Sequence, residues 1–297
     1  LLKNAGFKVD IHIMPDLPGS NVDMDRQMFY YILNTPYLQA DHWKIYPCSV
    51  TNWTMIKKWY EEGSYKPYGE NGTELFDLLC EILPRIPSWI RVNRVIRDIP
   101  NRSILGGNKI VHMRSTLQDE LRKRNNYPTD IRAREVKSRK VNLDNARLYI
   151  RTYSSSEGME YFISYEDRDT QTLYGFVRLR LPEEWTIKCL EGCALVRELH
   201  VYGNLVKVGC KDSKVQHYGF GKKLLEEAER IAKLNNYKKI AVISGIGVRN
   251  YYRKRGYYYK DTYMIKDICY ICIKKHVLNL LVGCLLLLLL HLLFHLF

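Results

Sequence analysis

One stretch of this chain, QHYGFGKKLLEEAERIAK at residues 216–233, restricts its possible folds because it joins a glycine turn to a helix behind a strand-like run at 195–208. Apolar residues at three- and four-residue spacing predict the amphipathic helix; they are Leu224, Leu225, Ala228, Ile231 and Ala232. The first amides of such a helix lack internal partners, and its dipole is positive at that end. The chain therefore has a candidate phosphate-binding turn, formed by Gly219, Phe220, Gly221 and Lys222.

A glycine turn alone is weak support for a binding site, because many helices begin after glycine. A second motif, NYYRKRGY at 250–257, places Tyr252 four residues before a Gly-aromatic pair. Together, Gln-x-x-Gly-x-Gly and this tyrosine-bearing segment resemble the two signatures of the GNAT acetyltransferase fold. The resemblance implies that the turn binds the pyrophosphate of acetyl-CoA.

Longer segments resemble one family that contains such a domain. Six segments are similar to the acetyltransferase domain of the catalytic, third subunit of Elongator: VRELHVYG (196–203), QHYGFG (216–221), EEAERIA (226–232), KIAVISG (239–245), RNYYRK (249–254) and GYYYKDTYMIK (256–266). Five others resemble the end of its radical S-adenosylmethionine (SAM) domain and the following linker: MPDLPG (14–19), KIYPC (44–48), KWYEEGSYKPY (58–68), RVNRVIRDIP (91–100) and DIRAREV (130–136).

The resemblance implies an α/β fold with several parts. We expect the C-terminal part of a radical SAM (β/α) barrel at 1–100, a basic tRNA-binding linker at 101–145 and a GNAT acetyltransferase domain at 146–268. Hydrophobic periodicity predicts helices at 23–33, 53–62 and 74–85, and strands at 42–47, 89–99, 161–165, 172–181, 193–201 and 239–244. The alternation of strands and helices in the first part fits a partial parallel barrel.

Acyl transfer needs an oriented thioester, an amide donor for the developing oxyanion and an acid for the leaving thiolate. Two parallel strands that separate leave backbone groups for the pantetheine arm of acetyl-CoA, and we place this pairing on Glu198, Leu199, His200 and Val201. Tyr252 resembles the tyrosine that protonates the thiolate, whereas its neighbour Tyr251 is the weaker candidate. Glu198 and His200 are equally plausible as a general base or as strand residues with structural hydrogen bonds.

The resemblance also implies a reaction. Acetyl-CoA, SAM and a [4Fe-4S] cluster would together add an acetyl-derived group to C5 of the wobble uridine, U34, of tRNA. The implied partners are tRNA, other Elongator subunits and a second copy of the chain. Two alternatives stay open: a protein-lysine acetyltransferase acting on histones or tubulin, and a scaffold that binds tRNA or Elongator subunits without catalysis.

The cysteines bear on the metal chemistry of the chain. The family's three closely spaced cluster cysteines are absent from these 297 residues, and the chain begins in mid-pattern, so we expect a fragment. Its eight cysteines are scattered, and the C-x-x-C at 269–272 has no second pair, which favours neither disulfides nor zinc. We therefore predict no metal site in this chain.

The net charge of +14 favours polyanionic or membrane-surface partners. Residues 97–140 hold twelve Lys or Arg against five Asp or Glu, which is half of that net charge. Clustered cations are typical of surfaces that bind a phosphate backbone. Tyr127 and His112 could stack on an unpaired base there, so the segment predicts a tRNA-binding surface.

The last 21 residues, 277–297, carry no Lys, Arg, Asp or Glu and include six consecutive leucines. A helix of this length reaches about 30 Å, the thickness of a bilayer core. Lys274 and Lys275 precede it, which is typical of a cytosolic flank. The sequence therefore predicts a transmembrane tail anchor in the mitochondrial outer membrane, or alternatively the endoplasmic reticulum, with the other domains facing the cytosol. Relatives without such a tail would instead be cytoplasmic or nuclear.

Overall fold

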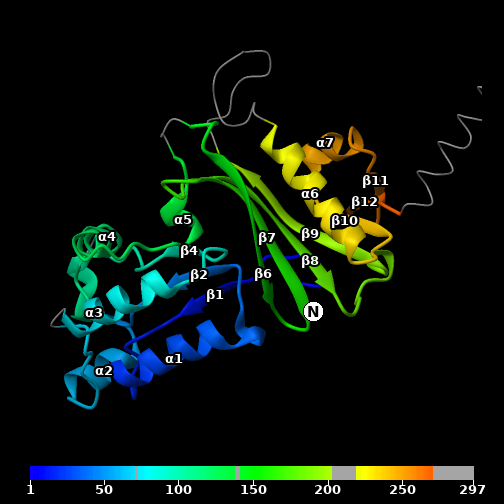
Figure 1. Cartoon of the computed structure of the whole chain (residues 1–297). Coiled ribbons are helices and arrows are strands. Elements are labelled where there is room, and N and C mark those ends of the chain that lie inside the picture. The colour runs from blue at the N-terminus through cyan, green and yellow to red at the C-terminus, as the bar shows by residue number, and fades with distance from the viewer. Residues whose placement is uncertain (71–72, 111, 138–140, 203–218, 270–297) are drawn as a thin grey trace, which may run out of the picture.

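The computed structural model describes residues 1–70, 73–110, 112–137, 141–202 and 219–269 (Figure 1). A three-stranded sheet lies in the first part of the chain, residues 1–137, which we call the N-terminal unit. A seven-stranded sheet lies in the second part, residues 141–269, which we call the C-terminal unit. Helices pack against both sheets, and the α/β class expected from the sequence is confirmed.

The N-terminal unit is built on parallel strands in the order β1-β2-β4, with bounds Asp10–Ile13, His42–Ile45 and Arg91–Arg94. Its helices are α1 (Val22–Asn34), α2 (Met55–Glu61), α3 (Thr73–Ile82), α4 (Met113–Lys123) and α5 (Ile131–Arg134). A small antiparallel pair joins β3 (Ser49–Thr51) to β5 (Ile104–Gly107). One face of the parallel sheet supplies Trp43 and Val92 to a core that includes Phe29 of α1 and Leu79 of α3.

The C-terminal unit is one sheet in the order β11-β12-β10-β9-β8-β7-β6. In chain order its strands are β6 (Ala146–Ser154), β7 (Gly158–Asp167), β8 (Leu173–Pro182), β9 (Cys193–Val201), β10 (Lys239–Ile243), β11 (Tyr258–Lys260) and β12 (Tyr263–Asp267). Its helices are α6 (Phe220–Leu234) and α7 (Arg249–Arg253). Strands β9 and β10 pair in parallel, and the other neighbouring strands pair antiparallel.

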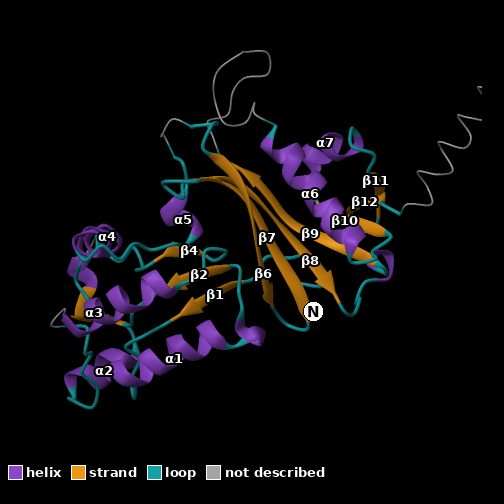
Figure 2. Ribbon diagram, in the orientation of Figure 1, coloured by secondary structure: helices purple, strands orange, loops and turns teal. Residues whose placement is uncertain are grey.

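Strand β8 is buried along its whole length, because α6 covers one face of the seven-stranded sheet and the N-terminal unit lies against the other (Figure 2). Val177, Leu179 and Leu181 lie in the same core as the apolar side of α6. Side chains alternate between the faces of a strand, so Arg178 and Arg180 point toward the N-terminal unit and contact its residues Asp41 and Asn4. Two arginines in a buried strand therefore mark the boundary between the units.

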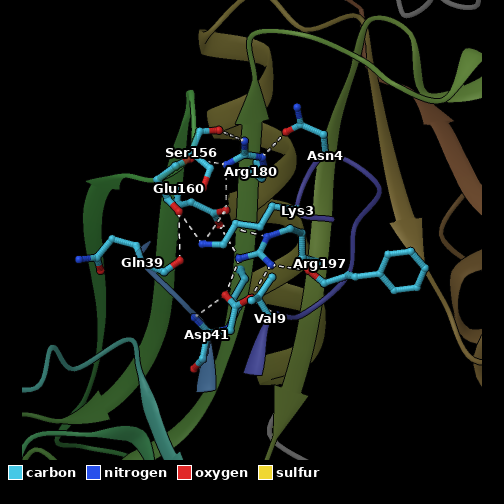
Figure 3. A network of polar contacts seen from close by, with 12 residues as sticks. Lys3, Asn4, Val9, Gln39, Asp41, Ser156, Glu160, Arg180 and Arg197 are labelled. Carbon is cyan, nitrogen blue, oxygen red and sulfur yellow. Dashed lines mark hydrogen bonds and ion pairs between the residues drawn. The ribbon is translucent and has the colours of Figure 1, made fainter. Parts of the chain in front are cut away.

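A buried ion cluster fills this boundary, and Figure 3 shows Asp41 and Glu160 converging on Arg197 of β9. Arg197 donates to both carboxylate oxygens of Asp41 at 2.8 and 2.5 Å, and to Oε2 of Glu160 at 2.9 Å. Arg180 adds a bond to Glu160 at 3.2 Å. Burial raises the pKa of Asp41, but the attraction of Arg197 and Arg178 outweighs burial and holds that pKa well below its ordinary value. The cluster is thus ionised and joins the two units.

Lys3 extends the cluster, with its Nζ 2.5 Å from Ser155 Oγ and 3.9 Å from Glu160. Burial lowers the pKa of Lys3 from 10.5 to about 8, against the attraction of Glu160 and Asp41. The unfolded chain therefore binds more protons than the folded one between pH 8 and 10.5, and this lysine's contribution to stability rises with pH in that window.

We expect Lys3→Met to remove this pH dependence. The free energy of unfolding of the wild type, relative to the variant, should rise by on the order of 3 kcal/mol across the window. Urea unfolding of both proteins at several pH values from below 8 to above 10.5 measures this. Lys58→Met is the control, because Lys58 is 64% exposed in its pair with Glu62. If the difference in the free energy of unfolding between the wild type and Lys3→Met stays constant across this pH range, the assignment to Lys3 is contradicted.

Several sequence predictions differ from the structure. The strand predicted at 89–99 is only Arg91–Arg94, because the chain then leaves the sheet and Arg94 pairs with Asp98 at 2.6 Å. Within the run at 195–208, strand β9 ends at Val201, and residues 203–218 lie outside the described residues. The predicted tail helix at 277–297 also lies outside them. Across the part of the chain that is described, no helix is both long and apolar enough to cross a membrane.

Candidate functional site

The candidate site begins where β9 and β10 separate. Their parallel pairing runs from Cys193 opposite Lys239 to Val196 opposite Val242. Strand β9 continues to Val201, and over this length it pairs only with β8 among the strands described. Its backbone edge from 197 to 201 is therefore open toward β10, and it contains the residues 198–201 on which we placed the pantetheine pairing. Such an edge can pair with an extended ligand.

A cavity of about 300 Å³ lies at this opening. Three segments line it, together with Val248 and Tyr252: residues 6–8 of the N-terminal unit, 197–200 of β9 and 242–245 at the end of β10. The structure thus brings four of the candidate site residues, Glu198, Leu199, His200 and Tyr252, to one cavity. It also adds residues 6–8, which the sequence reasoning missed. No local signal marks them, since they reach the cavity only through the contact between the units.

Glu198 and His200 differ in their surroundings. Glu198 accepts from Arg178 at 3.0 Å and from Lys8 at 3.0 Å. Burial raises the pKa of Glu198, but the attraction of Arg178 and Lys8 outweighs it, so that pKa lies below its ordinary value. His200 keeps contact with solvent while its ring lies 4.4 Å from that of Tyr202, and partial burial lowers its pKa. At neutral pH the carboxylate is ionised and the imidazole is uncharged.

Tyr252 lies on α7 and is only 6% exposed. Its ring packs edge-on against Tyr251 and Tyr257, with centroids 5.2 and 5.6 Å apart. Tyr257 is itself fixed, because its hydroxyl donates to Glu229 of α6 at 2.9 Å. Burial raises the pKa of Tyr252 to about 12. The phenol is therefore protonated at neutral pH and can act as a proton donor.

The start of α6 lies beside the end of β9. Gly219 precedes the helix with φ at +71°, a left-handed conformation that favours glycine. No side chain at this position caps the first amides of α6. A Cβ at Gly221 would lie 3.0 Å from the Tyr251 hydroxyl and 3.5 Å from Val201. That hydroxyl is buried and has no hydrogen-bond partner among the described residues. The site thus combines a helix start, an open strand edge and two tyrosines.

Two other residues of the predicted turn play different parts. The side chain of Phe220 is 3% exposed and packs with Val136 and Tyr174, so only its backbone faces the turn. The side chain of Lys222 is 63% exposed, and its ammonium lies 3.7 Å from Glu226, at the surface of the helix start.

The face of the three-stranded sheet opposite its core is polar. Lys44 lies 2.9 Å from Asp10 and 3.3 Å from His12 Nε2, and Asn93 lies 3.3 Å from Asp10. Arg91 of β4 donates to the hydroxyl of Tyr202, the residue after β9, at 3.1 Å. The polar face therefore connects to the end of the open strand.

A separate cavity of about 470 Å³ lies at the carboxyl ends of β1, β2 and β4. It is lined by His12, Tyr46, Arg94 and Arg97 among others. The guanidinium of Arg97 lies 6.0 Å from the Tyr46 ring centroid. Ligands of open α/β sheets commonly bind at this end of the strands.

The basic segment 97–140 is only partly a surface. Arg134 is 6% exposed and pairs with Glu166 of β7 at 2.9 Å. Arg132 donates to the Asn93 carbonyl, and Arg114 donates to that of Val92. These cations hold the segment to the two sheets. Exposed charge remains at the end of α4, where Arg122 and Lys123 are 62% and 76% exposed.

The described residues contain no group of three or more His, Cys, Asp or Glu placed to hold a metal ion. Cys48 and Cys80 lie in separate cores of the N-terminal unit, whereas Cys189 and Cys193 lie together in the C-terminal unit. This part of the chain therefore offers no ligand set that fits an iron–sulfur cluster.

Comparison with known proteins identifies close relatives. The chain is 40% identical over 276 residues to Elongator complex protein 3 of Danio rerio, covering 90% of this chain and 50% of that protein. It is 41% identical over 277 residues to a tRNA uridine(34) acetyltransferase of Methanocaldococcus jannaschii, covering 90% of this chain and 51% of that protein. The solved structure of archaeal Methanocaldococcus infernus Elp3 with an N-terminal deletion superposes with a TM-score of 0.81 at 37% identity, covering 90% of this chain and 65% of that one.

These relatives overturn one prediction. The expected location at the mitochondrial outer membrane, or alternatively the endoplasmic reticulum, is wrong, because the relatives are Elongator proteins. The described helices also include none that could cross a bilayer. The leucine-rich composition of the tail led to this prediction, and composition alone does not establish an anchor.

The family model for the Radical_SAM C-terminal domain matches residues 40–123, which hold β2, β4 and the helices α2 to α4. The chain spans about half the length of the curated relatives that it matches. The solved archaeal relative superposes over 90% of the chain, well beyond the segment 40–123 that the family model matches. Over nine-tenths of its length, this chain is therefore a homologue of Elongator complex protein 3.

Proposed function

We propose that this chain binds acetyl-CoA and forms the acyl-transfer part of an enzyme that modifies C5 of the wobble uridine, U34, of tRNA. The observation that carries the proposal is the open edge of β9 at a cavity that also holds a buried, protonated tyrosine. The name of the Methanocaldococcus jannaschii relative, a tRNA uridine(34) acetyltransferase, supports the choice of substrate.

In this proposal residues 146–268 form a GNAT acetyltransferase domain. The pantetheine arm pairs with the backbone of residues 198–201, and the pyrophosphate lies on the amides that begin α6, near Gly219 and Gly221. The amides near His200 and Val201 donate to the oxyanion that develops when the thioester is attacked. Tyr252 then gives its proton to the leaving thiolate.

The contacts of the two candidate bases favour His200. Glu198 is held by two cations, which makes it a weak proton acceptor. His200 is uncharged at neutral pH and reaches solvent, so it can take a proton from an attacking water or acceptor. We assign Glu198 to the architecture of the strand instead.

The proposed site for tRNA lies on the N-terminal unit. Its first part, 1–100, would be the C-terminal portion of a radical SAM barrel, and 101–145 a tRNA-binding linker. Support comes from the cavity at the carboxyl ends of β1, β2 and β4, where Arg94, Arg97 and Tyr46 offer cations and an aromatic face. The exposed cations at the end of α4, with Tyr127 at 56% exposure, fit a phosphate backbone and an unpaired base.

SAM and a [4Fe-4S] cluster belong to the chemistry of radical SAM proteins, to which the match over 40–123 points. Because the described residues offer no ligand set for the cluster, we route no step of this chain's chemistry through it. Other Elongator subunits, and a second copy of the chain, are proposed partners.

The test is the release of CoA from acetyl-CoA by the purified chain. We expect slow hydrolysis that rises when a tRNA with U34 is added, while isothermal titration shows CoA binding at one site. Activity seen only with histone or tubulin lysines would favour the protein acetyltransferase instead. CoA binding without turnover under any of these conditions would contradict the proposal. It would favour the alternative of a non-catalytic scaffold that binds tRNA or Elongator subunits.

A further inference from the structure

The open edge of β9 begins at an irregularity in the sheet. Strands β8 and β9 pair Arg178 with Glu198 and Leu179 with Val196, so Arg197 has no partner opposite it in this register. Bulges of this kind redirect side chains and often lie beside functional sites. Here the bulge leaves Arg197 and Glu198 both facing the N-terminal unit, where they contact Asp41 and Lys8, at the start of the predicted ligand-pairing segment.

The N-terminal unit holds that bulge from several directions. Asp41, the residue before β2, accepts two bonds from Arg197 and a third, at 2.8 Å, from the backbone amide of Val9. Arg197 also donates to the carbonyl of Phe7 at 2.8 Å. The carboxylate of Asp41 therefore binds both the segment 7–9 and strand β9.

That segment is a wall of the acyl cavity. Residues 6–8 line it opposite the ends of β9 and β10. Gly6 approaches β10 closely, because a Cβ there would lie 3.3 Å from two atoms of Ile243. Lys8 then reaches across to Glu198, whose other oxygen is held by Arg178. Glu198, in the open edge, is thus held from two sides, by Arg178 of the sheet and by Lys8 of the N-terminal unit.

We propose that Lys8 and Asp41 are positioning residues for acyl transfer: through Glu198 and Arg197 they fix the open edge of β9 and close the cavity over the thioester. The inference rests on the proposed acetyl-CoA site and adds that this site is complete only when the N-terminal unit is docked. Lys8 and Asp41 orient the strand whose amides would meet the oxyanion, and neither needs to touch the reacting atoms. Misplacement of a group in the site by about 1 Å can slow a reaction by about 10²-fold.

Lys8→Met is the most informative variant. The Lys8 side chain is 42% exposed, so its loss should leave the fold intact. We expect acetyl-CoA turnover to fall about tenfold, while the Kd for CoA stays within about twofold, because most contacts of CoA would lie at the start of α6. Lys8→Arg should restore most of the turnover. Lys57→Met is the matched control, since Lys57 is 34% exposed in a pair with Glu61.

A second readout does not depend on activity. Amide hydrogen exchange of the peptide that covers residues 197–201 should be faster in Lys8→Met than in the wild type, and unchanged in Lys57→Met. A parallel weakening of CoA binding and turnover, or unchanged turnover with unchanged exchange, would overturn the proposal.

The two readouts separate this inference from the proposed function. Wild-type protein that neither binds CoA nor hydrolyses acetyl-CoA would contradict the proposed function, whereas faster exchange in Lys8→Met would still support the contact through which Lys8 holds Glu198. If the wild type is active and Lys8→Met is equally active, the proposed function still holds but Lys8 has no positioning role.

Discussion

Replacing Tyr252 with Phe is expected to lower the turnover of acetyl-CoA about a hundredfold and to leave the Kd for CoA nearly unchanged. The substitution removes one hydroxyl from a side chain that is 6% exposed and keeps the ring packing against Tyr251 and Tyr257. A proton donor positioned at a leaving group typically accelerates a reaction by about 10²- to 10⁴-fold. Steady-state release of CoA, with titration calorimetry for the Kd, measures the two quantities.

Two other tyrosines provide the comparison. Tyr259→Phe is the control, because Tyr259 is 47% exposed on β11 and does not line the cavity. Tyr251→Phe tests the neighbour whose buried hydroxyl lies near the start of α6. A large loss in Tyr251→Phe with none in Tyr252→Phe would transfer the proton-donor role to Tyr251.

The second large effect should be on stability. Asp41→Asn is expected to lower the free energy of unfolding by about 3–5 kcal/mol, because removing one partner of a buried ion pair leaves the other without compensation. Asp41 and Arg197 are both fully buried, and the carboxylate also accepts from Val9. For a chain of this size the loss corresponds to a fall in Tm of roughly 10 °C. Urea unfolding and differential scanning calorimetry measure it.

Asp98→Asn is the matched control for this experiment. Asp98 pairs with Arg94 at 2.6 Å, but its side chain is 78% exposed, and pairs in that setting contribute about 0.5 kcal/mol or less. Equal stabilities of Asp41→Asn and the wild type would mean that water or Glu160 compensates Arg197, and the cluster would then not join the units as described.

The sequence predicted the helices and strands that have strong hydrophobic periodicity. The helix after the glycine turn is α6, and the strand predicted at 193–201 has those bounds. The parallel strands at the acyl cavity were expected from the same motifs. These elements bury an apolar stripe or an alternating face, so local spacing is sufficient to locate them.

The segment 101–145 was predicted as a linker, yet it contains β5, α4 and α5. Charge dominated the interpretation, although Met113, Leu117 and Leu121 have helical spacing and are buried. Strand β6 was also missed, because its residues are half-exposed at the sheet edge and carry little hydrophobic contrast. Both elements are defined by what they pack against.

The boundary between the units was beyond local patterns as well. Arg178, Arg180 and Arg197 look like solvent-facing residues of amphipathic strands, but the N-terminal unit covers them. Asp41, the acidic partner of Arg178 and Arg197, is more than 130 residues away from both in the chain. Only the tertiary structure brings these charges together. The same contact between the units brings residues 6–8 to the cavity.

The charged character of this buried boundary affects how its halves could be separated and rejoined. The arginines and carboxylates of the ion cluster would be readily hydrated if the units came apart, so this part of the boundary would expose little apolar surface. Complementary charge would speed the encounter of separate halves, and added salt would slow it. Once closed, the ion cluster excludes counterions and would be far less responsive to ionic strength.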